Sequence, residues 1–94
     1  MNYYKKSDGE RISKSEIDRR VRIAKAEKLQ EQRNEFGYNF CEEKGCGRSD
    51  GYIDCSHDKS VNDCQREGMS ELAYDKNNIT IRCRDCHIIW DSKY

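Results

Sequence analysis

The chain has 94 residues, of which 34% are hydrophobic and 38% are charged, and its formal net charge at pH 7 is zero. A chain of this size can bury only a modest apolar core, so we expect one domain that depends on a metal or on disulfides for stability. The sequence contains no run of about 18 apolar residues and no apolar segment near its start, which argues against a membrane span and a secretory signal and favours a cytoplasmic protein.

Charge is unevenly distributed along the chain. Residues 1–36 hold ten Lys and Arg against seven Asp and Glu, whereas residues 37–94 hold eight against eleven. A basic segment is typical of a surface that contacts phosphates, although mixed charges also occur on ordinary solvated helices. The candidate phosphate contacts in the basic segment are Arg19, Arg20, Arg22 and Lys25.

The N-terminal third predicts one long helix. Residues 1–12 are expected to form a flexible N-terminus, and residues 13–37 a basic helix. Ser13 and Glu16 have the spacing of a capping box, and no Gly or Pro follows before Gly37.

The apolar face of this helix is narrow. Ile17, Val21 and Ala24 share one side, but Lys28 continues the same line. We therefore expect the helix to project from the rest of the chain, to lie on a partner or pair with a second copy, or to dock only at its C-terminal end. The candidate docking residues are Leu29, Phe36 and Tyr38.

Residues 38–94 predict a small α+β domain in which short apolar bursts alternate with turn residues. Residues 51–57 and 78–82 have the composition of strands, and the polar residues 58–69 between them indicate a loop. Residues 86–94 suffice for about two turns of helix.

The six cysteines favour metal ligands over a disulfide framework, because paired cysteines in a reducing compartment commonly bind zinc. Cys83 and Cys86 have a two-residue spacer, and Cys41 and Cys46 have a four-residue spacer that neighbouring glycines permit. These four thiolates predict a structural Zn²⁺ site. The other two cysteines either replace a ligand of the first pair or are buried thiols; they are Cys55 and Cys64.

The two histidines lie next to these features. His87 directly follows Cys86, and it is either a structural ligand or, with four thiolates already present, a ligand for a harder cation such as Mg²⁺. His57 lies at the end of the first predicted strand, where a neutral imidazole could deprotonate a water molecule. Taken singly, each histidine could equally be a packing residue.

The order of these residues resembles the HNH, or His-Me finger, endonucleases. The closing motif of that family is similar to Asn-Leu-x-x-Leu-Cys-x-x-Cys-His, and residues 78–87 read Asn-Ile-Thr-Ile-Arg-Cys-Arg-Asp-Cys-His with the same spacing. The basic helix, the cysteine pair and residues 54–57 resemble especially the small phage recombination nucleases of the NinG (Rap) type. The resemblance covers residues 38–91 well and the helix more loosely.

This resemblance implies a zinc-stapled ββα-metal domain over residues 38–94 that hydrolyses DNA phosphodiester bonds. His57 would be the general base, Asn78 would orient the loop that carries the base, and His87 would bind Mg²⁺ or another divalent cation. The DNA would be branched or single-stranded and, if the chain is phage-encoded, would be cut in the host bacterial cytoplasm during recombination or processing.

The cation site implied by the resemblance needs a carboxylate. Ser56 stands where the family frequently has Asp, so Asp54 or Asp58 would have to serve. The candidate phosphate contacts near this site are Arg48, Arg82 and Arg84.

A binding protein is the competing hypothesis. A catalytically silent zinc module that binds DNA or a host protein would keep the same scaffold, and Ser56 in place of Asp favours it. The joint presence of His57, Asn78 and His87 favours the nuclease, because a zinc adaptor has no need of these side chains.

Overall fold

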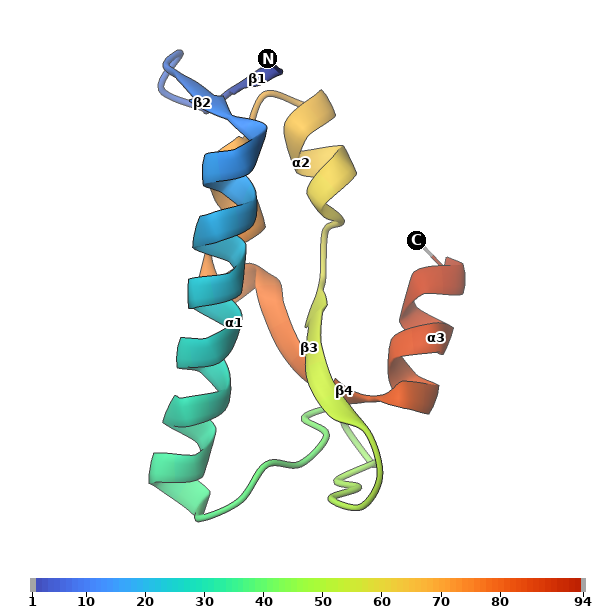
Figure 1. The fold of residues 1–94 in the computed structure, drawn as a ribbon. Helices are drawn as coiled ribbons and strands as arrows, with labels where there is room; N and C mark the ends of the chain where they lie inside the picture. The colour runs from blue at the N-terminus through green and yellow to red at the C-terminus, as the bar shows by residue number, and fades with distance from the viewer. Residues whose placement is uncertain (1, 94) are drawn as a thin grey trace.

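The fold is described by a computed structural model that covers residues 2–93. The 23-residue helix α1 (Lys14–Phe36) runs along one side of a two-stranded antiparallel sheet, which consists of β3 (Ile53–His57) and β4 (Ile79–Cys83). The helix α3 (Arg84–Lys93) follows β4 directly and lies on the other side of this sheet (Figure 1). The predicted α+β class and its long N-terminal helix are confirmed.

The predicted strands and the C-terminal helix are present with small shifts. The strands predicted at 51–57 and 78–82 are β3 and β4, which pair with His57 opposite Ile79. The last helix begins at Arg84, slightly before its predicted start. Two residues of the predicted terminal segments lie outside the described range: Met1 and Tyr94.

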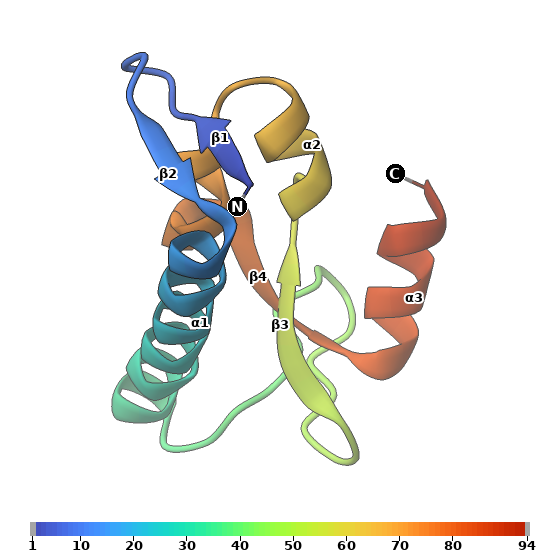
Figure 2. The same cartoon turned by 45° about the horizontal axis from the view of Figure 1, so that its top comes forward.

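The N-terminal residues form a hairpin where the sequence predicted a flexible segment. β1 (Tyr3–Lys5) pairs antiparallel with β2 (Arg11–Ser13). Figure 2 shows this hairpin at the N-terminal end of α1. Ile12 in β2 is only 7% exposed and packs with Ile17 of α1, so the hairpin belongs to the core. Strands of three residues are too short for their alternation to be recognised in sequence.

The start and the end of α1 follow local rules. The Ser13 hydroxyl accepts a hydrogen bond of 3.2 Å from the backbone N–H of Glu16, as the capping pattern predicts. At the other end, Gly37 adopts a φ of 87°, which favours glycine, and its N–H donates to the carbonyl of Arg33.

The N-terminal half of α1 also docks on the rest of the protein, contrary to the prediction that the helix projects or docks only at its C-terminal end, and the predicted contact of Leu29 is present. Ile17 is fully buried and Ala24 is 4% exposed, whereas Phe36 and Tyr38 are each 53% exposed. The narrow apolar face suffices because its few side chains are themselves members of the two clusters that form the core. These clusters are Ile12, Ile17, Cys64 and Ala73, and Ala24, Cys55, Ile79 and Ile81.

Residues 58–69 contain a helix that the sequence did not predict, α2 (Val61–Arg66), which is capped by Ser60. Two 3-10 turns follow it, η1 (Ser70–Tyr74) and η2 (Lys76–Asn78). Six residues are too few to display a helical period, so the polar sequence by itself predicts a loop. Within residues 2–93, no helix has both the length and the apolar character that crossing a membrane requires.

Candidate functional site

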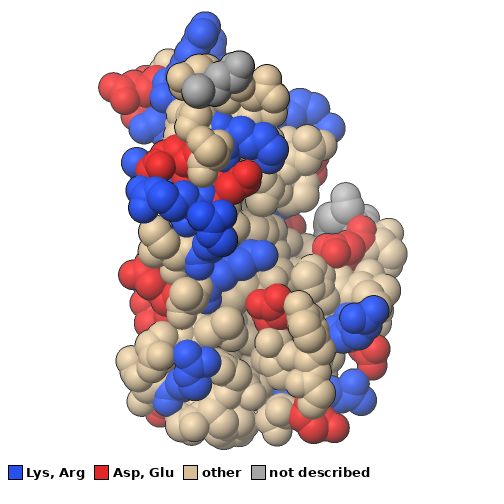
Figure 3. Space-filling model, viewed as in Figure 1, with Lys and Arg blue, Asp and Glu red and all other residues tan. Residues whose placement is uncertain are grey.

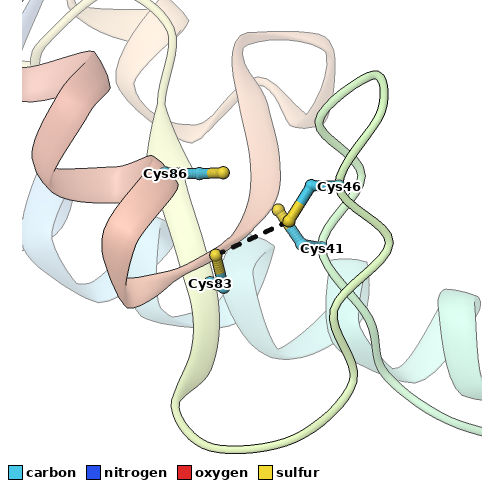
Figure 4. Close-up of side chains that lie close together, drawn as sticks. All are labelled: Cys41, Cys46, Cys83 and Cys86. Atoms are coloured by element: carbon cyan, nitrogen blue, oxygen red, sulfur yellow. Dashed lines mark hydrogen bonds between the residues drawn. The ribbon is translucent and has the colours of Figure 1, made fainter.

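The four cysteines predicted as zinc ligands come together from two distant segments. Cys41 and Cys46 belong to the loop between α1 and β3, Cys83 ends β4, and Cys86 lies in the first turn of α3. Their Sγ atoms all lie within 4.8 Å of one another and point toward a common centre (Figure 4). The cluster can therefore hold a metal ion.

The geometry of the cluster suits tetrahedral coordination by sulfur. The Sγ atoms of Cys46 and Cys83 are 3.8 Å apart. A tetrahedron with Zn–S bonds of about 2.3 Å has edges of about 3.8 Å, so this separation fits two ligands of one Zn²⁺ ion. The other two cysteines, Cys55 and Cys64, are fully buried outside the cluster, which supports the buried-thiol alternative, and all six cysteines are free thiols.

The backbone around the cluster explains how the unusual four-residue spacer is accommodated. Gly45 and Gly47 have φ values of 83° and 68°, in the left-handed region that glycine adopts readily. The N–H of Cys41 donates to the carbonyl of Arg48 and closes the loop. The side chain of Glu42 accepts the N–H of Ile81, which ties the loop to the edge of β4.

The thiols of the cluster differ in their ionisation. The backbone N–H of Cys86 holds the pKa of the Cys83 thiol to about 7, below its ordinary value of 9.0, so its thiolate forms near neutral pH. Burial raises the pKa of Cys41 and of Cys86, and neighbouring thiols raise the pKa of Cys86 further. Gathering four thiolates is costly without a cation, and a bound divalent metal offsets that cost.

His57 ends β3 and is held by a backbone carbonyl. Its Nε2 lies 2.7 Å from the carbonyl oxygen of Ala73. Burial lowers the pKa of His57 below 6.5, and the positive charge of Lys25 acts in the same direction. A carbonyl can only accept, so Nε2 carries the proton in the neutral ring, and Nδ1 is left as the acceptor. This is the state that a general base requires.

The side chain of Asn78 joins the two ends of the connection between β3 and β4 by hydrogen bonds. Its Oδ1 accepts the backbone N–H of Lys59 at 2.8 Å, and its Nδ2 donates to the carbonyls of Lys59 and Leu72, each at 3.0 Å. Its own carbonyl accepts the N–H of Asp58, the residue that follows His57. The side chain therefore restrains the backbone next to the histidine.

His87 lies on α3 and is paired with Asp91, a carboxylate that was not among the residues predicted for the site. Its Nε2 is 3.3 Å from Oδ2 of Asp91, one helical turn later. Asp91 also lines two cavities, one of about 300 Å³ beside His57 and one of about 340 Å³ beside His87. An imidazole and a carboxylate at this spacing can bind a divalent cation. The four-residue separation on a predicted helix was the available signal.

Asp54 and Asp58, the two carboxylates predicted to bind this cation, accept hydrogen bonds from within the protein. Asp58 accepts hydrogen bonds from Thr80 at 2.8 Å and from Arg82 at 2.9 Å. Asp54 accepts the hydroxyl of Tyr52 at 2.7 Å and the N–H of the residue that follows it. Both oxygens of Asp54 are therefore occupied. The bonds to Asp58 both fall on Oδ1, and Asp58 borders the cavity beside His57, so it stays a candidate ligand together with Asp91.

Arg82 was predicted to contact phosphate, and its burial contradicts that role. It is 2% exposed, bonds Glu43 at 2.6 Å and Asp58 at 2.9 Å, and lies 4.2 Å from the ring centre of Trp90. Strand alternation alone does not reveal that α3 covers this face of β4. Arg48 and Arg84 are exposed, and Arg48 pairs with Asp85.

Basic side chains gather over the N-terminal half of α1, with carboxylates between them (Figure 3). Arg19 and Arg20 both bond Glu16, whose pKa falls to about 2 as a result. In the part of the chain that the structure describes, Arg22 and Lys25 take part in no ion pair. They are therefore the more available of the predicted phosphate contacts on this helix.

Comparison with known proteins gives no relative for this chain. No protein-family model matches it, and no match was found among curated proteins or among solved structures. Any functional conclusion therefore depends on the geometry of the site itself.

Proposed function

We propose that the protein is a metal-dependent DNA endonuclease of the HNH type, with β3, β4 and α3 as its ββα unit and a structural Zn²⁺ bound by the four cysteines. One observation carries this proposal. His57, neutral and fixed by the Ala73 carbonyl, and His87, paired with Asp91, line two cavities that share the Asp91 side chain.

In the proposed reaction, Nδ1 of His57 takes a proton from the water that attacks phosphorus. The bond of Nε2 to Ala73 orients the ring, and the Asn78 side chain holds the backbone beside it. His87 and Asp91 would hold the catalytic divalent cation, which when bound stabilises the charge that develops on the scissile phosphate and the leaving oxygen.

The zinc cluster has a positioning role in this proposal. Cys83 and Cys86 span the junction between β4 and α3, so a metal bound there fixes the angle at which α3 presents His87. DNA is the proposed substrate, with Arg22, Lys25 and Arg84 as phosphate contacts. A part in phage recombination is suggested by the sequence resemblance alone.

The silent DNA-binding or protein-binding zinc module is the second candidate. The observation in its favour is that both oxygens of Asp54 and Oδ1 of Asp58 accept internal hydrogen bonds, which leaves His87 and Asp91 as the main side chains for the cation. Mg²⁺ is often held in proteins by few side chains, with water and substrate phosphate as its other ligands, so two ligands are compatible with catalysis.

The deciding experiment is cleavage of supercoiled plasmid, single-stranded DNA and a four-way junction by purified protein with Mg²⁺ or Mn²⁺. We expect His57→Ala to reduce the rate about 100-fold or more, the usual contribution of a general base, with unchanged zinc content and circular dichroism. Cleavage that persists in His57→Ala contradicts the assigned base. No cleavage by the folded, zinc-loaded wild type would favour the silent module.

A further inference from the structure

The cavity beside His87 has a feature that phosphodiester hydrolysis alone does not require. One of its walls is Tyr52, which is 56% exposed, and another is Ile88, which is 55% exposed. Large exposed apolar side chains that share one cavity commonly mark a binding surface. The volume of about 340 Å³ lies within the usual range for ligand pockets. The lining residues are Tyr52, Arg84, His87, Ile88 and Asp91.

The Tyr52 ring is held in place in spite of its exposure. Its hydroxyl donates to Asp54 at 2.7 Å, which fixes the orientation of the ring. Its carbonyl accepts the N–H of Arg84 at 3.2 Å, which ties the backbone before β3 to the start of α3. A fixed aromatic surface loses little entropy when a ligand stacks on it.

We propose that this cavity binds an unpaired nucleobase of the DNA substrate, with Tyr52 as the stacking surface. Ile88 would contact the edge of the base or the sugar, and Arg84, which forms no ion pair within residues 2–93, would bind an adjacent phosphate. This inference rests on the proposed nuclease function and adds to it a subsite for an unpaired base next to the cation site.

The selectivity for unpaired bases follows from geometry. In a duplex, both faces of a base are covered by its neighbours, so a single exposed ring cannot stack on it without unstacking the helix. In a single strand, a flap or a junction, the face of the base is available. Because His87 and Asp91 border the same cavity, the base would lie next to the phosphate at the cation site. The substrate is therefore DNA with an unpaired nucleotide beside the scissile bond.

Binding can be tested separately from cleavage. All proteins would carry His57→Ala, and fluorescence anisotropy would measure their affinity for a short single strand and for the duplex of the same sequence. We expect Tyr52→Ala to weaken single-strand binding about tenfold and to leave duplex binding unchanged, whereas Tyr52→Phe, which keeps the ring, retains most of the affinity. Tyr38→Ala is the matched control, since Tyr38 is 53% exposed and lies outside this cavity.

A base analogue supplies a second readout. The fluorescence of 2-aminopurine in the single strand should be quenched on binding and should recover in the complex with Tyr52→Ala. Equal weakening on single strand and duplex, or no weakening, would overturn the stacking site. If Tyr52 governs binding but the wild type cuts nothing, the nuclease proposal fails and the subsite stands; if the wild type cuts without regard to Tyr52, only the subsite fails.

Discussion

At the scale of single residues, the environment of His57 predicts a pH dependence. Burial lowers the pKa of His57 below 6.5, so the imidazole is neutral at pH 7 and can accept a proton. Cleavage should therefore be on its plateau at neutral pH and should fall about tenfold per unit once the pH drops below that pKa. A rate profile of wild type measured at saturating cation checks this. If the cleavage rate falls at low pH with a midpoint above pH 6.5, the general base is a group other than His57.

Arg82 and Arg84 differ by two positions in sequence and should differ sharply in their effect on stability. Arg82 lies 2% exposed between Glu43 and Asp58, so Arg82→Ala leaves two carboxylates without their partner and should lower the free energy of unfolding by about 3 kcal/mol. Arg84→Ala, at an exposed position, should change it by less than about 0.5 kcal/mol. Urea unfolding of zinc-loaded protein measures both, and similar values would refute the buried ion pairs.

At the scale of elements, α1 is held by a few deeply placed side chains rather than by a broad apolar face. Ile17 is fully buried and Ile23, on the same helix, is 45% exposed. Ile17→Ala should cost about 3 kcal/mol, from lost apolar burial and the cavity left behind, while Ile23→Ala should cost under about 1 kcal/mol. The pair can be compared by thermal unfolding. Equal losses would mean that the helix does not dock at its N-terminal half.

At the scale of the whole molecule, the cysteine cluster joins the loop after α1 to β4 and α3. Structural zinc contributes about 10 kcal/mol or more in small domains, which equals the entire stability of many proteins of this size. A strong chelator should therefore unfold residues 38–93, with only part of the α1 helix signal surviving. Circular dichroism combined with zinc analysis measures this, and an unchanged spectrum after verified zinc removal would contradict the prediction.

Two cysteine variants separate ligation from packing. Cys46→Ser should reduce zinc content, because Cys46 belongs to the cluster. Cys64→Ala should keep full zinc content, since Cys64 is buried among apolar side chains away from the cluster, and should show only a packing loss. Zinc loss in Cys64→Ala would mean that the ligand set is assigned incorrectly.

Local patterns in the sequence determined the cap at Ser13, the two strands, the start of α1 and the four clustered cysteines. Each of these depends on backbone geometry over a few residues, which sequence spacing expresses directly. The hairpin at the N-terminus and α2 were missed because both are too short to display a period.

Tertiary structure alone decided which side chains are free to act. The alternation along β4 indicates two faces for the strand but not that α3 covers one of them, which buries Arg82. Asp91 joins Asp58 as a candidate cation ligand because the fold places it at the cavities beside His57 and His87. Both carboxylate oxygens of Asp54 accept hydrogen bonds from its near neighbours Tyr52 and Cys55. The sequence of α1 likewise did not predict which of its side chains are buried. Their burial depends on the surfaces that the other elements present to the helix.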